Sequence, residues 1–209
     1  MKKIIIVSLF ALSLGWAAQA SAGQGLYVGG NVGVAMVPDV DIVDPAVPGD
    51  VGTMSYDSGV ALSGALGYAI QNIRFEAEFA WQQNDLDSLE LMGWDFPLTG
   101  DVDVISGMVN GYFEIPTGSP WKPFVTGGLG MARVEMNDFN AVDSGAADWS
   151  GDDTVFAWQV GAGVGYAINE RATVEVRYRY FATDDAEFDD GSTLEFASHN
   201  ISLGLRLTF

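Results

Sequence analysis

Residues 201–209, at the end of the chain, read Ile-Ser-Leu-Gly-Leu-Arg-Leu-Thr-Phe. Every odd position carries a large apolar side chain, and every even position carries a small or polar one. Because successive side chains of a β-strand point to opposite faces, this period of two predicts a strand with one apolar face and one small, polar face.

The same alternation recurs along most of the chain. The predicted strands cover residues 25–37, 58–70, 73–82, 104–115, 122–134, 155–168, 172–181 and 196–209. Long polar connections at 38–57, 83–103, 135–153 and 182–195 alternate with short turns at 71–72, 116–120 and 169–171. This order predicts an all-β fold, an eight-stranded antiparallel up-and-down β-barrel with two unlike ends.

Composition excludes several other classes of protein. The chain has 209 residues, 26 Gly, no Cys, one His and a formal net charge of -19. So many Gly residues disfavour a helical bundle, and the lack of Cys excludes disulfide scaffolds and thiolate zinc sites. The scarcity of Lys and Arg argues against a nucleic-acid partner, and no residue pattern indicates a cofactor.

The first 22 residues have the composition of a secretory signal peptide. Lys2 and Lys3 precede an apolar run, and Ala20-Ser21-Ala22 fits a small-residue cleavage site. We expect cleavage after Ala22, with Ala20 and Ala22 read at the site, so that residues 23–209 form the barrel domain. The apolar run is shorter than the ~20 residues that a membrane-spanning helix needs, which disfavours an N-terminal anchor.

The volume of the apolar face indicates which side of each strand points outward. The interior of an eight-stranded barrel is just wide enough for its own side chains or for one small ligand. The large apolar side chains of eight strands exceed that space, whereas Gly, Ala, Ser and a few charged groups fit it. We therefore expect the apolar face to contact lipid; a soluble two-sheet sandwich, with the charged face in water, remains the alternative.

Charged residues of both signs share the small-residue face of neighbouring strands. A buried charge needs a partner, so this pattern predicts an ion-paired network that fills the lumen. The predicted network comprises Arg74, Glu76, Glu78, Lys122, Glu175, Arg177, Arg179 and Arg206. Aromatic residues near the strand ends, such as Trp81, Trp158 and Tyr180, are typical of an interfacial belt.

Several motifs together resemble the small outer-membrane β-barrel family that includes the OmpA transmembrane domain, OmpX and the opacity-type surface proteins. They are the Gly-rich segments 25–33, 123–130 and 157–166, the segment 176–180, and the alternating end of the chain. The resemblance implies a barrel in the outer membrane of a Gram-negative cell, with short periplasmic turns and four long acidic extracellular loops. It also implies contact with outer-membrane lipid and lipopolysaccharide.

The end of the chain is similar to the C-terminal assembly signal of that family. The signal residues would be Leu203, Leu205, Leu207 and Phe209. The resemblance implies that the barrel-assembly machinery reads them in the periplasm.

The four long connections hold most of the 28 acidic residues and no Lys or Arg. Clustered carboxylates supply the oxygen ligands that Ca²⁺ takes, so loosely bound divalent cations are one interpretation. A solvated acidic surface is the other, and no EF-hand spacing supports a specific metal site.

These observations leave three functions open. The first is a structural or surface-interaction role, such as adhesion or ion binding by the loops, with a filled lumen. The alternatives are a small cation-preferring channel and a soluble secreted or periplasmic binding barrel. An enzyme is not expected: Ser198 and Asn200 fall on the face opposite to His199, which breaks the arrangement that a Ser-His hydrolase needs.

Overall fold

The structure is a computed structural model that describes residues 25–43, 50–91, 94–141, 149–187, 193–194 and 196–209. The predicted signal peptide, with Ala20 and Ala22, lies outside the described residues and stays a prediction. Within the described part, no helix is long and apolar enough to cross a membrane.

The described elements are strands throughout. They are β1 (Gly25–Met36), β2 (Val40–Val43), β3 (Asp50–Tyr56), β4 (Gly59–Ile70), β5 (Ile73–Leu91), β6 (Trp94–Glu114), β7 (Trp121–Ala141), β8 (Trp149–Ala167), β9 (Ala172–Thr183), β10 (Ala186–Glu187), β11 (Thr193–Leu194) and β12 (Ala197–Thr208).

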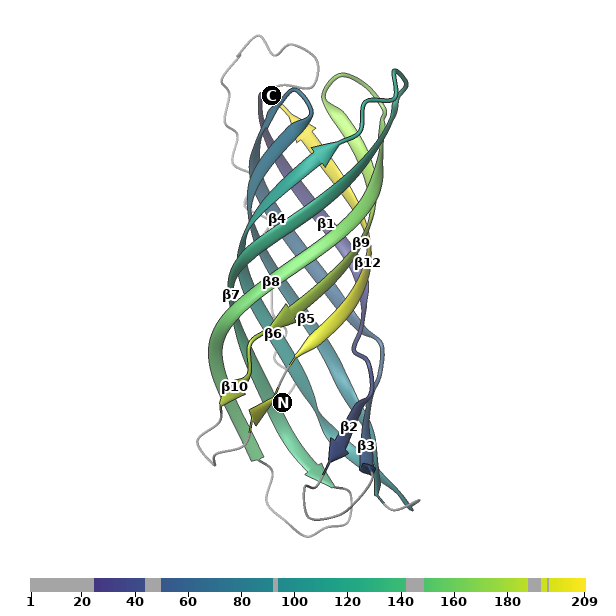
Figure 1. Cartoon of the computed structure of the whole chain (residues 1–209), viewed down its shortest axis with the longest axis vertical. Helices are drawn as coiled ribbons and strands as arrows, with labels where there is room; N and C mark the ends of the chain where they lie inside the picture. The colour runs from purple at the N-terminus through teal and green to yellow at the C-terminus, as the bar shows by residue number, and fades with distance from the viewer. Residues whose placement is uncertain (1–24, 44–49, 92–93, 142–148, 188–192, 195) are drawn as a thin grey trace, which may run out of the picture.

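Eight of these strands form a closed antiparallel ring in the order β1, β4, β5, β6, β7, β8, β9, β12 (Figure 1). The first and last strands close it, from Tyr27 opposite Thr208 to Met36 opposite His199. Each strand of the ring pairs with both neighbours, so the ring leaves no free edge. The predicted eight-stranded antiparallel β-barrel is confirmed.

The expected long loops are largely strand, which corrects the predicted boundaries. β5 continues to Leu91 and β6 begins at Trp94, while β7 and β8 reach Ala141 and Trp149. The paired strands therefore extend beyond the ring as ribbons, and β2 and β3 add to the side of β5. The ladder continues because the alternation does: Leu86, Val102 and Val134 are buried on the inner side of the ribbons.

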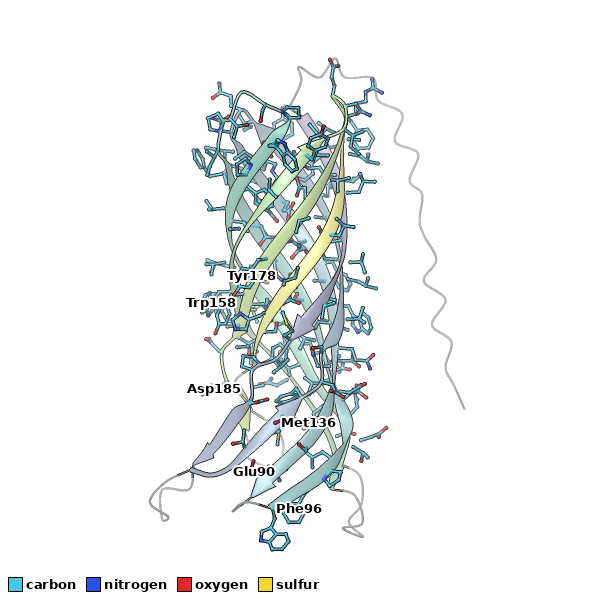
Figure 2. The ribbon with its side chains drawn as sticks, turned by 90° about the vertical axis from the view of Figure 1, so that its right-hand side faces the viewer. Glu90, Phe96, Met136, Trp158, Tyr178 and Asp185 are labelled. Atoms are coloured by element: carbon cyan, nitrogen blue, oxygen red, sulfur yellow. The ribbon has the colours of Figure 1, made fainter. Side chains whose placement is uncertain are left out.

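The two ends of the barrel differ in their connections. The turn end holds the short connections after β4, β6 and β8, and the ribbon end holds the extended ribbons (Figure 2).

The apolar face of the ring points outward. Phe79 is 62% exposed and Leu203 55% exposed, whereas Arg74 and Glu78 on the opposite face are buried. The outward apolar residues form a continuous apolar band around the ring. Near the ribbon end the outward residues become polar. On β6 the outward residue next to Ile105 on the ribbon-end side is Asp103, and on β7 the one next to Met131 is Arg133. This orientation is the reverse of the one that a soluble barrel or sandwich requires.

Candidate functional site

The inner face of the ring carries charged side chains in two groups. The turn-end cluster consists of Arg74, Glu114, Glu175 and Arg206, and the central cluster of Glu76, Glu78, Arg177 and Arg179. They come from β5, β6, β9 and β12. The inward side chains are at even-numbered positions on β5, β6 and β12 and at odd-numbered positions on β9.

In the turn-end cluster each carboxylate contacts two arginines. Arg206 Nε lies 2.8 Å from Glu175 Oε1, and Arg206 Nη2 lies 2.9 Å from Glu114 Oε1. Arg74 Nε lies 2.9 Å from Glu114 Oε1, and its Nη2 lies 3.5 Å from Glu175 Oε1. The Arg74 guanidinium also lies over the ring of Tyr112, 4.3 Å from its centroid. The cluster thus joins four side chains from four strands, β5, β6, β9 and β12.

In the central cluster Glu78 is the shared acceptor. Its two oxygens lie 3.0 Å from Arg177 Nη2 and 3.0 Å from Arg179 Nη1. Gln159 from β8 receives a further hydrogen bond from Arg179, at 3.2 Å. These side-chain contacts link β5, β8 and β9 across the centre of the lumen.

Glu76 lies beside the central arginines but is held mostly by neutral donors. The hydroxyls of Tyr27 and Tyr112 donate to its carboxylate, and Asn110 Nδ2 donates to it at 3.2 Å. Arg177 Nη1 donates to the Tyr112 hydroxyl at 2.8 Å. Tyr112 therefore joins the two clusters, since its ring also lies under Arg74.

The charges of the two clusters balance, with four arginines and four glutamates. Such balance matters because a buried charge without a partner costs several kcal/mol. The space between the clusters, lined by Tyr112, Arg177 and Leu205 among others, has a volume of about 10 Å³. That is roughly the space that one water molecule needs.

The sequence-based list of lumen residues differs from the structure at two positions. Seven of the eight predicted residues lie in the clusters, but Lys122 does not: it is half-buried near the start of β7, and no ion pair joins it to a described residue. Glu114 takes part instead, although it is not among the predicted residues. The signal was present, because Glu114 shares the inward register of Asn110 and Tyr112 on β6.

Two glycines make room for aromatic rings in the lumen. A Cβ atom on Gly67 would clash with the ring of Tyr27, and a Cβ atom on Gly163 would clash with the ring of Phe124. Both rings are buried. Gly on one strand therefore pairs with a large side chain on the next, which fills the interior without widening the ring.

Towards the ribbon end the interior becomes apolar. Val104, Met108, Val134, Phe181 and Phe196 belong to one buried apolar cluster, with Tyr56 packed against it. This cluster lies on the ribbon-end side of the ion pairs, so the described interior changes from charged to apolar along the barrel axis.

The outward side of the ribbons is acidic where the apolar band ends. Asp103 accepts hydrogen bonds from Trp81 Nε1 at 3.0 Å and from Asn137 Nδ2 at 3.3 Å. Partial burial and the negative charge of Asp101 raise the pKa of the Asp103 carboxyl from 3.8 to about 6. The hydrogen bond from Trp81 acts in the opposite direction and lowers this pKa, but by less. Nearby, Arg133 pairs with Glu135 and Asp152 while staying half-exposed.

His199 is not arranged for hydrolysis. Its Nδ1 shares a hydrogen bond of 2.7 Å with the Tyr178 hydroxyl on the outside of the ring. Ser198 points into the lumen, where its Oγ donates to Gln82. Among the described residues, no group of three or more His, Asp and Glu side chains is placed to hold a metal ion.

The four residues of the suggested assembly signal, Leu203, Leu205, Leu207 and Phe209, are exposed at the outward face. Their recognition by assembly machinery stays a prediction.

Comparisons with known proteins agree with this architecture. A family model described as the outer membrane protein beta-barrel domain matches residues 4–209. The outer membrane protein PagN of Salmonella typhimurium is 25% identical over 241 residues, which span all of both chains. OprG from Pseudomonas aeruginosa has a TM-score of 0.62 at 16% identity, over 90% of this chain and 98% of that one. Neisserial surface protein A has a TM-score of 0.60 at 20% identity, over 90% and 100%.

The central cluster generates a stability prediction. Glu78→Gln removes the carboxylate that Arg177 and Arg179 share, so it should lower the free energy of unfolding by about 3–5 kcal/mol. Arg133→Gln, which breaks ion pairs of a side chain that is 51% exposed, is the control and should cost less than about 1 kcal/mol. Urea titration of the protein folded in lipid vesicles measures both. Equal costs for the two variants would contradict a stabilising network.

Asp103 generates a pH prediction. Its raised pKa means that the folded chain binds more protons than the unfolded chain between about pH 4 and about pH 6, so the ionisation of Asp103 opposes folding above that window. Asp103→Asn should therefore raise the urea midpoint at about pH 8 and leave it unchanged at about pH 4. Glu90→Gln, at an exposed ribbon position, is the control. A D103N effect that does not vary with pH would show that Asp103 titrates normally.

Proposed function

This chain belongs to the outer membrane protein β-barrel family, and from that premise we propose that it is a closed barrel that presents its ribbons outside the cell for surface interaction. It is a protein of the outer membrane. The orientation, the closed lumen and the role of the ribbons are the proposed parts.

The lumen contents support a closed barrel. The ion pairs of the two clusters cross the interior between β5, β6, β9 and β12. The pocket lined by Arg74, Glu76 and Arg206 among others has a volume of about 10 Å³, roughly the space of one water molecule. The apolar cluster adds a second obstacle, since an ion that passed it would lose its water of hydration. A cation-preferring channel is the alternative that these contacts disfavour.

The ribbon between β5 and β6 carries the observation that supports surface interaction. Trp94 is 73% exposed and Phe96 45% exposed, and Figure 2 shows Phe96 at the far end of the ribbon. Exposed carboxylates of Asp85, Asp87 and Glu90 lie along the same ribbon. Large aromatic side chains often act as anchors of protein interfaces, and acidic surroundings favour a basic partner. We therefore propose that the tip binds a partner protein whose surface is basic and carries an apolar patch.

Catalysis, cation binding and recognition by the assembly machinery are not part of this proposal. The proposal includes no catalysis, because the ring of His199 bonds Tyr178 outside the barrel while Ser198 faces the lumen. Loosely bound divalent cations on the acidic ribbons and recognition of the chain end by the assembly machinery are carried forward as predictions.

The closed lumen predicts the electrical behaviour of the protein. In planar bilayers the folded protein should give no steady open level, because the paired charges and the apolar cluster leave no continuous aqueous path. Single-channel recording measures this. A sustained conductance step with a preference for cations would favour the channel alternative.

The exposed tip predicts a loss of surface binding. Cells that display the protein should be retained on a layer of a basic globular protein such as lysozyme. Trp94→Ser combined with Phe96→Ser should reduce retention to the level of cells that lack the protein, because the loss of one anchor side chain worth at least about 2 kcal/mol already weakens an interface about thirtyfold. Trp121→Ser, at the turn end, is the matched control and should retain cells normally. Unchanged retention for the double variant would reject the tip as the contact.

A further inference from the structure

Lys122 belongs to the predicted lumen network, but neither charged cluster includes it. It occupies an even-numbered position on β7, as the buried Phe124 does, so its side chain starts from the inner face of the barrel. Within the part of the chain that the structure describes, no hydrogen bond or ion pair reaches its ammonium group. The rim of the turn end therefore carries a half-buried cation that is not bonded to any described carboxylate.

Lys122 lines two polar pockets at the turn end. One is bounded by the connections 71–72 and 116–120, the other by the connections 116–120 and 169–171, and each has a volume of about 280 Å³. Small-molecule sites usually measure about 300–1,000 Å³, so either pocket suits a small ligand or one group of a larger one. The second is called the rim pocket here, and its lining includes Ser119, Lys122, Asn169, Thr173, Arg206 and Thr208.

The rim pocket brings a second cation beside Lys122. Arg206 is 5% exposed, and its Nε and Nη2 atoms pair with the two carboxylates of the turn-end cluster. Its third nitrogen, Nη1, has no such partner among the described residues, which leaves two N–H groups for a ligand. The hydroxyls of the buried Thr173 and Thr208 are neutral donors in the same pocket. The lining therefore offers several donors of both kinds.

The charges around the rim pocket leave a positive balance. The turn-end cluster, to which Arg206 belongs, is neutral because its two arginines pair with its two glutamates. The connection 169–171 adds the exposed Glu170 and Arg171, which offset each other, and Lys122 adds one further positive charge. The described Asp residues all lie at the ribbon end, beyond the length of the ring. At 0.1 M salt a field decays over about 10 Å, so an anion at the rim responds mainly to the local charges.

The walls of the rim pocket are held in place by the protein itself. The Ser119 hydroxyl accepts a hydrogen bond of 3.3 Å from the backbone N–H two residues later, and the Asn169 side-chain carbonyl accepts two backbone hydrogen bonds of 2.8 Å each. Gly165 lies opposite Lys122 in the strand register, where a Cβ atom would come 2.9 Å from Thr173. Glycine thus keeps this space open, and a ligand has little chain to order when it binds.

We propose that the rim pocket binds the anionic oxygen group of a small molecule, a carboxylate or a phosphate. The Lys122 ammonium and Arg206 Nη1 supply the cationic contacts, and the two threonine hydroxyls complete the set of donors. Hydrogen bonds from cationic donors to an anionic acceptor are about twice as strong as neutral ones. In the proposed orientation the turn end faces the periplasm, so the ligand is a periplasmic molecule. The binding itself depends neither on that orientation nor on the partner of the ribbon tip.

The chain offers a matched control for Lys122. Arg171 is a cation at the same end of the barrel, but it is exposed and does not line the rim pocket. Lys122→Met and Arg171→Met each remove one positive charge and keep an unbranched side chain. If anions only gathered in the general field of the turn end, the two variants would behave alike.

The test is a titration of the ¹⁵N-labelled, folded protein in zwitterionic detergent micelles with sodium succinate or with sodium phosphate. Sodium chloride keeps the ionic strength constant and serves as the reference anion. The chemical shifts of the Gly165, Thr173 and Thr208 amides report on the pocket. The shift in gel mobility between unheated and heated samples verifies that each variant folds.

We expect at least one of the two anions to move these signals saturably, with a dissociation constant in the millimolar range. The tighter of the two identifies the group as a carboxylate or a phosphate. K122M should weaken this binding about tenfold, because a hydrogen bond to a charged group typically contributes at least that factor, and R171M should change it less than about twofold. Shifts no larger than those with chloride, or equal losses in the two variants, would overturn the proposal.

Discussion

The pairing of β1 with β12 is the constraint on which the rest of the structure depends. In a hydrocarbon environment an unpaired strand edge leaves N–H and C=O groups without partners, and each such group costs several kcal/mol. The ladder from Tyr27–Thr208 to Met36–His199 removes the last edge. Once the ring is closed, every side chain must point either to lipid or into a narrow enclosed space.

The enclosed space explains the composition of the inner face. It admits charged groups only as compensated sets, and the turn-end and central clusters supply four arginines and four glutamates that contact one another. It admits large rings only where the neighbouring strand has glycine, as at Gly67 beside Tyr27. The ion-paired interior and the acidic ribbons are the two features that support the proposed surface-interaction role.

The strand pattern was predictable because lipid and lumen impose opposite requirements on alternate residues. Two features were not. The ribbons beyond the ring keep the same alternation, since Leu86, Val102 and Val134 pack inward there as well, so the sequence pattern does not mark where the ring ends. The alternation also predicts which face a side chain lies on but not its position along the barrel axis. It therefore does not separate Lys122, which lies near the start of β7, from Glu114, which joins the network.

The sequence by itself determined the number of strands in the ring, their antiparallel order and the outward direction of the apolar face, because these follow from a period of two repeated in segments between turns. Only the tertiary structure decided which charges meet and which aromatic rings adjoin. Glu78 reaches Arg177 across about a hundred positions of sequence, and Tyr178 reaches His199 on the next strand. Such contacts depend on strand register and on the diameter of the closed ring, and neither is encoded in any single segment.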